Sequence, residues 1–418
     1  MGAARAAGAD ERVARAHDDR HRAPAVDHSR SGLDRRPRAR RDRRAGDVGL
    51  AAGGAGSIRP ARARTDGVID VRGTRALFVL DSGPPFSGRD YRTSGVGGTE
   101  SCVVLLGEAL AARGATVVVA NRVAAPVIDA GVRYVPLSAI GADEFDLIVL
   151  WKHWSDAVAN RGTTRLFIWT DVHIPDPANL ARCRAWAHLS LTLSEFQRNR
   201  LAAATGAIGI ETLGAPIEVA DYADAPSPKE QILLYCSVPD RGLYYLKDLF
   251  PAIRQRVPDA KLVITSDFTL WGARPARDAF LTYFAGQAGV EYAGHLSRPE
   301  LVEWQRRARV MAYPCTFEEG FCLSAAECMA AGAVPVTTGA YALVTTVADG
   351  GVLVKGRPRS WFYRRRFVRA CVDLLTDDDR WRDLASRGRA RALGEYAPAR
   401  IADKLIDAAH RARRLPTH

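Results

Sequence analysis

The stretch 318-EEGFCLSAAECMAAGAVPVTT-338 places two glutamates, Glu319 and Glu327, eight residues apart around small and apolar residues. It follows the apolar run 309-RVMAYPC-315 and ends in a second apolar run, 333-AVPVTT-338. Continuous apolar runs of this length are typical of buried strands, and the residues between the runs have helical spacing. The stretch therefore predicts strand, loop, helix and strand, the repeating unit of an α/β sheet.

The helix in this stretch is expected to begin at about Leu323 and to stop at Gly332. A helix N-terminus at the carboxyl end of a strand attracts anions, and Gly320 lets a ligand approach the backbone closely. Glu319 lies at the mouth of this anion site and Glu327 about one turn into the helix, so the helix start separates them. That separation argues against a glycosidase carboxylate pair, which faces one bond. It favours a long ligand with a phosphate at its centre and hydroxyl groups at both ends, such as a nucleotide sugar.

Other apolar runs of the same kind form two series, separated by a proline-containing segment. The first series has runs at 75–83, 116–122, 146–151, 164–171 and 187–194, and the second series begins with runs at 232–237 and 260–266. The pattern predicts two Rossmann-like α/β domains, each built on a parallel sheet. The predicted order is a disordered tail at 1–70, an N-terminal Rossmann-like domain at 71–215, a linker at 216–231, a C-terminal Rossmann-like domain at 232–392, and a C-terminal helix at 393–418 that packs back on the first domain.

The chain has 418 residues and a formal charge of +12. Residues 1–66 contain 16 Arg against 9 Asp and Glu, which gives +7, and they contain no Phe, Trp or Tyr. Such a segment buries too little apolar surface to fold, so we expect it to be disordered. Binding of nucleic acid or anionic lipid by Arg35 to Arg44 is the alternative; acids interrupt this run and no stacking residue is present, which favours a solvated tail.

Cysteine usage and hydropathy indicate a cytoplasmic protein. The seven cysteines form no CxxC pair, and the cluster of Cys315, Cys322 and Cys328 has no histidine beside it. This pattern favours buried, reduced thiols over a zinc site. No apolar run reaches the ~18 residues of a transmembrane helix. Peripheral association with the inner face of the cell membrane is left open.

The spacing of Glu319 and Glu327 inside 319-EGFCLSAAECMAAGAVPV-336 resembles the signature of the family 4 glycosyltransferases, also called glycosyl transferases group 1. These are retaining enzymes of the GT-B fold, in which two Rossmann-like domains face each other across a cleft. The resemblance implies that residues 71–215 form the acceptor-side domain and residues 232–392 the nucleotide-sugar donor domain. The resemblance implies that Glu319 holds hydroxyls of the donor sugar and that Glu327 holds the ribose hydroxyls. It also implies that backbone N–H groups hold sugar and phosphate oxygens; these belong to Gly320, Phe321, Cys322 and Leu323.

Three further segments extend the resemblance over most of residues 75–410. The segment 94-SGVGGTESCVVLLGEALAARGATVVV-119 resembles the family's first glycine loop and helix. By this likeness, Gly97, Gly98 and Thr99 approach the diphosphate from the first domain. The segment 192-TLSEFQRNRL-201 resembles a later helix start, with Ser194 as the expected N-cap.

The third segment, 235-YCSVPDRGLYYLKDLFPAI-253, opens the second domain. The resemblance implies that Arg241 replaces the lysine that neutralises the diphosphate. Many relatives carry an additional Arg near the position of Ser237, so the phosphate site of this chain is expected to have one cation fewer. Lys247 is expected at the surface.

A looser match, 168-IWTDVHIPD-176, concerns the family's His-Asp pair near the donor sugar. Asp171 stands in a suitable place, but Thr170 occupies the aligned histidine position. His173, two residues past Asp171, is the candidate for the histidine's role. A loop histidine without a role is the alternative.

The sequence thus predicts a GT-B glycosyltransferase with Glu319, Arg241, His173 and Asp171 as catalytic residues and a nucleoside-diphosphate sugar as donor. No metal and no cofactor are expected, because no DxD-type motif stands in a suitable place. The expected acceptor is a carbohydrate, a lipid-linked sugar or a small molecule, and no specific nucleic acid is expected. The alternatives are a nucleotide-sugar epimerase, a phosphorylase that would need a pyridoxal phosphate lysine, and a nucleic-acid binder that acts through the tail.

Overall fold

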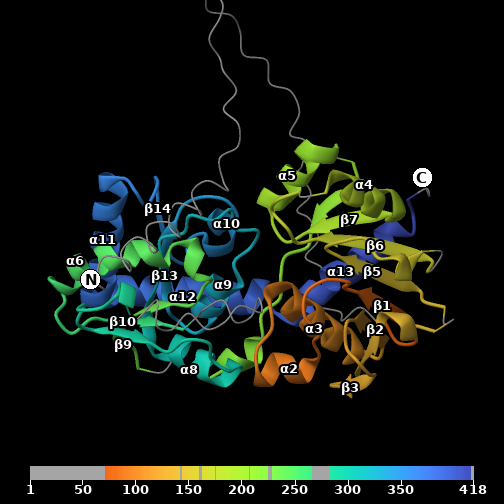
Figure 1. Cartoon of the computed structure of the whole chain (residues 1–418), viewed down its shortest axis with the longest axis horizontal. Helices are drawn as coiled ribbons and strands as arrows, with labels where there is room; N and C mark the ends of the chain where they lie inside the picture. Colours follow the sequence, from red (N-terminus) through yellow and green to blue (C-terminus); the bar gives the residue numbers. More distant parts are fainter. Residues whose placement is uncertain are drawn as a thin grey trace, which may run out of the picture. The chain divides into compact units, whose positions relative to one another are not determined.

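The computed structural model describes residues 71–415, apart from 142–143, 160–161, 175, 207, 225–227 and 266–281. Two separate sheets organise this part of the chain, and both belong to the same folded unit (Figure 1). The tail predicted at residues 1–70 lies outside the described residues.

The first sheet has eight strands in the order β3-β4-β2-β1-β5-β6-β7-β8. All described neighbours in it are parallel except β3, which runs antiparallel to β4. Its strands are β1 (Arg75–Val79), β2 (Thr116–Asn121), β3 (Val127–Asp129), β4 (Val132–Pro136), β5 (Leu147–Trp151), β6 (Thr164–Trp169), β7 (Leu189–Thr192) and β8 (Ile210–Thr212). The helices of this domain are α2 (Gly88–Thr93), α3 (Gly98–Ala111), α4 (Pro177–Trp186) and α5 (Glu195–Thr205).

The central strands of this sheet are apolar on both faces because helices cover both faces. Successive residues of β1 show this: Phe78 packs in the core that contains Val104 of α3. Leu77 and Val79 pack in a second core on the opposite face. Strand side chains alternate between faces, so a strand covered on both sides must be apolar throughout.

The second sheet is parallel and has six strands in the order β11-β10-β9-β12-β13-β14. Its strands are β9 (Glu230–Tyr235), β10 (Lys261–Ile264), β11 (Val290–Tyr292), β12 (Ala308–Tyr313), β13 (Val334–Thr338) and β14 (Val352–Val354). The helices of this domain are α6 (Leu246–Arg254), α8 (Arg298–Arg307), α9 (Leu323–Ala330), α10 (Leu343–Val347), α11 (Trp361–Thr376) and α12 (Asp378–Glu395).

The first helix of the second domain, α6, does not begin directly after β9. Two 3-10 turns, η5 (Pro239–Arg241) and η6 (Leu243–Tyr245), precede α6. Pro251 lies inside α6 and has no N–H to donate to the carbonyl of Lys247. The side-chain amide of Gln287 donates to that carbonyl instead, at 2.7 Å.

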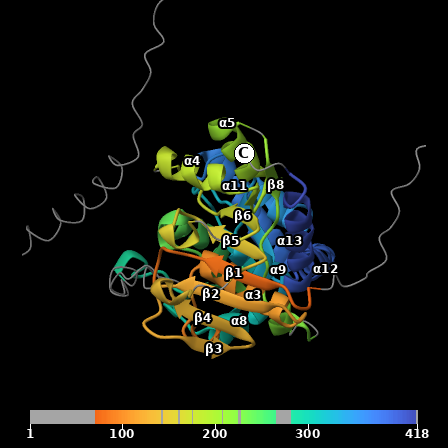
Figure 2. The same cartoon turned by 90° about the vertical axis from the view of Figure 1, so that its right-hand side faces the viewer.

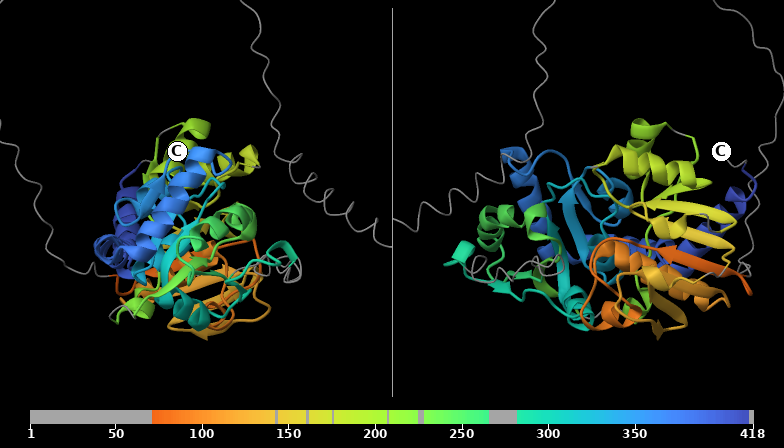
Figure 3. Two further views of the ribbon diagram at one scale, coloured as in Figure 1. Left: turned by 90° about the vertical axis from the view of Figure 1, so that its left-hand side faces the viewer. Right: turned by 45° about the vertical axis from the view of Figure 1, so that its right-hand side comes forward.

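The chain crosses between the domains twice. After the linker and the second domain, α13 (Pro398–Ala412) returns to pack on α3 and β6 (Figures 2 and 3). An ion pair of 2.9 Å joins Arg113 to Asp403 of α13. The two crossings touch each other, because the Ile217 N–H donates to the Tyr396 carbonyl at 2.9 Å. The first domain therefore contains both an early and a late segment of the chain.

Each sheet has one point where the strand order reverses direction. In the first sheet this point lies between β1 and β5, and in the second it lies between β9 and β12. Open α/β sheets bind ligands at the carboxyl ends of the strands at this point. Lys152 follows β5, Arg241 follows β9 and Glu319 follows β12, so the topology itself selects these loops.

All seven cysteines are buried and free. In the described part of the chain, no helix has the length and apolar character needed to cross a membrane.

Candidate active site

The loop between β12 and α9 directs the start of a helix toward the carboxyl edge of the second sheet. Cys322 has φ 78 and precedes Leu323, the first residue of α9. The first N–H groups bonded within the helix belong to Ala325 and Ala326, which donate to the Cys322 carbonyl at 3.2 and 3.3 Å. The N–H groups ahead of them are those that a helix start offers to an anion.

Two side chains of this loop, those of Phe321 and Cys322, belong to the hydrophobic core. Phe321 is 6% exposed and packs edge-on against Tyr396, and its carbonyl accepts from the Thr346 hydroxyl at 2.6 Å. Cys322 is also buried. These side chains therefore serve the core, and only backbone groups of this part of the loop remain for a ligand.

Glu319 is the buried acid of the loop, with only 4% of its surface exposed. The Tyr313 hydroxyl donates to its Oε1 at 2.5 Å, and Nη1 of Arg241 donates to the same oxygen at 3.1 Å. Burial raises the pKa of Tyr313, and the adjacent Glu319 raises it further, so the hydroxyl keeps its proton. The Ser237 hydroxyl in turn donates to Tyr313 at 3.2 Å. Within the described ranges, the second oxygen of Glu319 has no hydrogen-bond partner, so it can accept hydroxyls.

Arg241 lies directly beside this carboxylate. Its loop is fastened to the Glu319 loop by the Thr316 N–H, which donates to the Arg241 carbonyl at 3.0 Å, and by the guanidinium, 4.2 Å from the Phe317 ring centroid. Gly242 has φ 138, and a β-carbon there would lie 2.3 Å from the Pro314 carbonyl oxygen. Burial lowers the pKa of Arg241, but Glu319 and the other neighbouring groups together raise it by more, so the net pKa is raised. The side chain therefore stays a cation next to the helix start.

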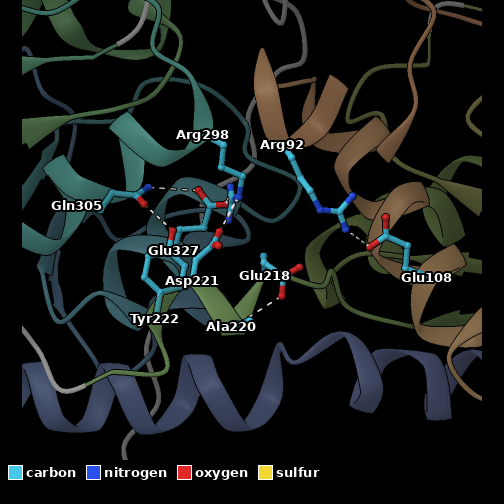
Figure 4. A network of polar contacts seen from close by, with 9 residues as sticks. All are labelled: Arg92, Glu108, Glu218, Ala220, Asp221, Tyr222, Arg298, Gln305 and Glu327. Atoms are coloured by element: carbon cyan, nitrogen blue, oxygen red, sulfur yellow. Dashed lines mark hydrogen bonds and ion pairs between the residues drawn. The ribbon is translucent and has the colours of Figure 1, made fainter. Parts of the chain in front are cut away.

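Glu327 lies on α9 and has partners of its own (Figure 4). Arg298 donates to its Oε1 at 2.9 Å and Gln305 donates to its Oε2 at 3.3 Å. Arg298 also donates to Asp221 at 2.8 Å and stacks 4.8 Å from the ring centroid of Tyr91 in the first domain. Glu327 is thus held in place by a network that reaches the linker and the first domain.

The glycine loop of the first domain meets the loop between β12 and α9 (residues 314–322), which we call the donor loop. Gly97 is the N-cap of α3. A β-carbon on Gly98 would lie 3.2 Å from Cδ1 of Leu323, so the starts of α3 and α9 are close together. The Thr99 hydroxyl donates to the hydroxyl of Thr170 at 3.2 Å. The two helix starts, one from each domain, therefore approach the same place.

The segment after β6 brings its polar residues to this junction. Asp171 lies 3.5 Å from the Lys152 ammonium and 3.5 Å from Nε2 of His153. His173 is exposed and packs edge-on against Phe317 of the donor loop. Two residues are candidates for the place of the family's histidine. His173 contacts Phe317 of the donor loop, whereas the Thr170 hydroxyl accepts a hydrogen bond from Thr99.

Several residues of the site were not predicted from sequence. Tyr313 and Arg298 each contact one of the two glutamates. Lys152 and His153 contact Asp171, and a signal for them exists, since they directly follow the apolar strand β5. Lys247, predicted as a surface residue, lies 4.2 Å above the Tyr283 ring.

Comparison with known proteins finds one family model and structures of the same fold. Residues 230–377 match the family model described as glycosyl transferases group 1. A comparison with curated proteins finds no match. Sucrose-phosphate synthase from Thermosynechococcus elongatus has a TM-score of 0.65 at 18% identity, over 81% of this chain and 98% of that chain. Anabaena HepE in complex with UDP and glucose has a TM-score of 0.60 at 17% identity, over 81% and 100%. The catalytic domain of Arabidopsis thaliana starch synthase IV, bound to ADP and acarbose, has a TM-score of 0.61 at 11% identity, over 82% and 99%.

At these identities the structural likeness shows the fold, so the predicted arrangement of two Rossmann-like domains is confirmed as GT-B. The matched glycosyl transferase domain carries Arg241, Glu319 and Glu327. Fold and domain together define the class of the protein: it is a transferase enzyme, a GT-B glycosyltransferase.

Proposed function

We propose that the protein transfers a sugar from a nucleoside-diphosphate sugar to an acceptor with retention of anomeric configuration, by the chemistry of family 4. The observation that carries the proposal is the pair Arg241 and Glu319, 3.1 Å apart beside the start of α9. A cation and free N–H groups suit the diphosphate, and a buried carboxylate with an unused oxygen suits sugar hydroxyls.

Departure of the nucleoside diphosphate develops negative charge on the phosphate oxygen that leaves the sugar. In this proposal Arg241 and the backbone N–H groups at the start of α9 face that oxygen and stabilise its charge electrostatically. The proposal assigns this role to the chain's own groups and requires no metal or other cofactor. Asp171 and His173 come from the first domain and are assigned to the donor sugar, because His173 contacts Phe317.

Glu327 is assigned to the ribose hydroxyls. A carboxylate has about four lone-pair sites, of which Arg298 and Gln305 use two. Two sites remain for a pair of vicinal hydroxyls. HepE with UDP-glucose and starch synthase IV with ADP support a nucleotide-sugar donor. The acceptor is left as a carbohydrate, a lipid-linked sugar or a small molecule.

A donor screen tests the proposal. The purified protein is incubated with UDP-, ADP- and GDP-sugars and candidate acceptors, and release of free nucleoside diphosphate is measured. At least one donor should be turned over, and Arg241→Ala should lower kcat/KM about 10–100-fold through loss of a charge-assisted phosphate contact. Lys404→Ala, which removes a basic side chain of α13, is the control. Nuclear magnetic resonance of the product reports the anomer, and an inverted product would overturn the retaining assignment.

A further inference from the structure

The first turn of α11 exposes two large aromatic side chains. Trp361 is 62% exposed and Phe362 is 67% exposed, although the next residue, Tyr363, is fully buried. The two rings pack edge-to-face, with centroids 5.0 Å apart. Two adjacent aromatic side chains on a solvent-exposed surface indicate a contact with an apolar partner.

A run of cations surrounds these aromatics. Residues 350–372 contain seven basic residues and no acidic residue: Lys355, Arg357, Arg359, Arg364, Arg365, Arg366 and Arg369. Asp248 pairs with Arg364, and Asp373 lies 3.8 Å from Arg369. Within the described ranges, no carboxylate pairs with Arg357, Arg365 or Arg366.

Helix geometry places the aromatic and basic side chains on one outward face. Tyr363, Phe367 and Cys371 are buried against the second sheet. Phe362, Arg365, Arg366 and Arg369 have the spacing i, i+3, i+4 and i+7, which is one stripe of a helix. We call Lys355, Arg357, Trp361, Phe362, Arg365, Arg366 and Arg369 the α11 face; all of these residues are exposed.

We propose that the α11 face docks on a membrane surface rich in anionic lipid. Trp and Phe side chains partition into the region between head groups and acyl chains, and Arg side chains bind lipid phosphates. The other polyanion that fits such a charge is single-stranded nucleic acid, which stacks its bases on aromatic faces. The Trp361 and Phe362 rings cover each other edge-to-face at 79°, so they suit insertion as one apolar unit better than stacking between bases.

The location of the face sets the orientation on the membrane. α11 follows β14, whose last residue Val354 pairs with Thr338 at the end of β13 (Figure 1). The loop that leads into α11 therefore leaves the carboxyl edge of the second sheet, the same edge from which the Glu319 loop leaves. Docking turns this edge toward the lipid. The proposal concerns binding alone and stands whether or not the chain transfers a sugar.

The test uses the full chain with two kinds of vesicle, phosphatidylcholine alone and an equal mixture of phosphatidylcholine and phosphatidylglycerol. We expect sedimentation with the mixed vesicles only. Arg365→Glu with Arg366→Glu should lower the affinity more than tenfold, since each cation near the surface contributes about fivefold. The matched control is Arg133→Glu with Arg256→Glu, two exposed arginines on other elements, which should keep most of the binding.

A second readout isolates the aromatics. Vesicles with brominated acyl chains should quench tryptophan emission of the wild-type chain, and Trp361→Phe should remove most of that quenching while leaving sedimentation intact. Residues 1–66 contain no tryptophan, so binding by the tail would not give this signal. The proposal is overturned if both double variants bind equally, if Trp361→Phe leaves the quenching unchanged, or if the α11 face binds an oligonucleotide and no vesicle.

Discussion

Gln197 of α5 and Gly320 of the donor loop meet across the two domains, with Nε2 of Gln197 only 2.5 Å from the position that a β-carbon on residue 320 would take. Gln197 is fully buried. Its amide donates to the carbonyls of Thr170 at 2.9 Å and Asp171 at 3.2 Å, and its Oε1 accepts from the Leu193 N–H at 2.9 Å. One side chain therefore holds the Asp171 segment in place and leaves room only for glycine opposite it.

Gly320→Ala should displace this amide and misalign the two sides of the site. We expect kcat/KM to fall on the order of 100-fold, because small displacements near reacting groups are costly. Gln197→Ala makes room for the added methyl group but loses three hydrogen bonds. The double variant should therefore lose less than the sum of the two single losses, which a double-mutant cycle measures. Strict additivity would show that the two residues do not interact.

Glu319 and Glu327 should act on opposite ends of one donor. Glu327→Gln should weaken binding of the nucleoside diphosphate about tenfold, because a charge-assisted hydrogen bond to the ribose is lost. Glu319→Gln should leave that affinity nearly unchanged and lower turnover of the full donor, because its contact is on the transferred sugar. Calorimetric titration with the nucleoside diphosphate, beside steady-state rates, separates the two effects. The reverse pattern would exchange the two assignments.

The glutamine variants are preferred because each carboxylate also has structural partners. Among the described residues, Glu327→Ala would leave Arg298 one carboxylate partner, Asp221, at 2.8 Å, and the Arg298 side chain is 10% exposed. Removing one member of a buried ion pair is strongly destabilising. Melting temperatures of all variants check that a lost activity is not a lost fold.

Two glycines of α12 should respond to alanine with opposite signs. A β-carbon on Gly388 would lie 2.8 Å from the Gly350 carbonyl oxygen, whereas a β-carbon on Gly394 meets nothing within 4 Å. Gly394→Ala should stabilise the fold by about 0.5–1 kcal/mol through helix propensity. Gly388→Ala should destabilise it by about 1–3 kcal/mol, as overpacking does. Urea unfolding of both variants measures the difference, and a stabilised Gly388→Ala would contradict the close packing.

Lys229 should make stability depend on pH above neutrality. Burial lowers the pKa of this amine to about 8, and it donates to the carbonyls of Gln305, Arg306 and Ala331. In the unfolded chain the pKa is about 10.4. Between these values the unfolded chain holds a proton that the folded chain has released, so this group makes the free energy of unfolding rise with pH.

The measurement compares urea unfolding of the wild type and Lys229→Met below and above the folded pKa. The free energy of unfolding of the wild type should increase relative to that of Lys229→Met as the pH rises from 8 toward 10. Lys261→Met, which removes an exposed amine at the start of β10, is the control and should show no such gain. Parallel pH profiles of wild type and Lys229→Met would contradict the lowered pKa.

Sequence patterns predicted what is local. The strands around the donor loop, the start of α9 at Leu323, and the N-cap Ser194 all depend on neighbours a few residues away, and the structure has them. Gly332, with φ 81, ends α9 as expected. These features could be predicted because periodicity and capping act within one or two turns.

Contacts between distant residues could not be predicted in the same way. Arg298 reaches Glu327 over 29 residues, and Tyr222 reaches Gln305 over 83. Gln197 lies in a segment for which the sequence predicts only a helix start, and its contact with Gly320 exists only after the two domains meet. Such partners depend on tertiary packing, which a pattern along one segment does not contain.

The return of α13 to the first domain makes the donor domain an insertion between two parts of one folded body. A force applied between residues 71 and 412 would therefore enter and leave through the first domain, where both residues lie. The load would fall on the contact of α13 with α3 and β6, with its Arg113–Asp403 pair, before any tension reached the second sheet. The second domain would bear no force until α13 detached from the first domain.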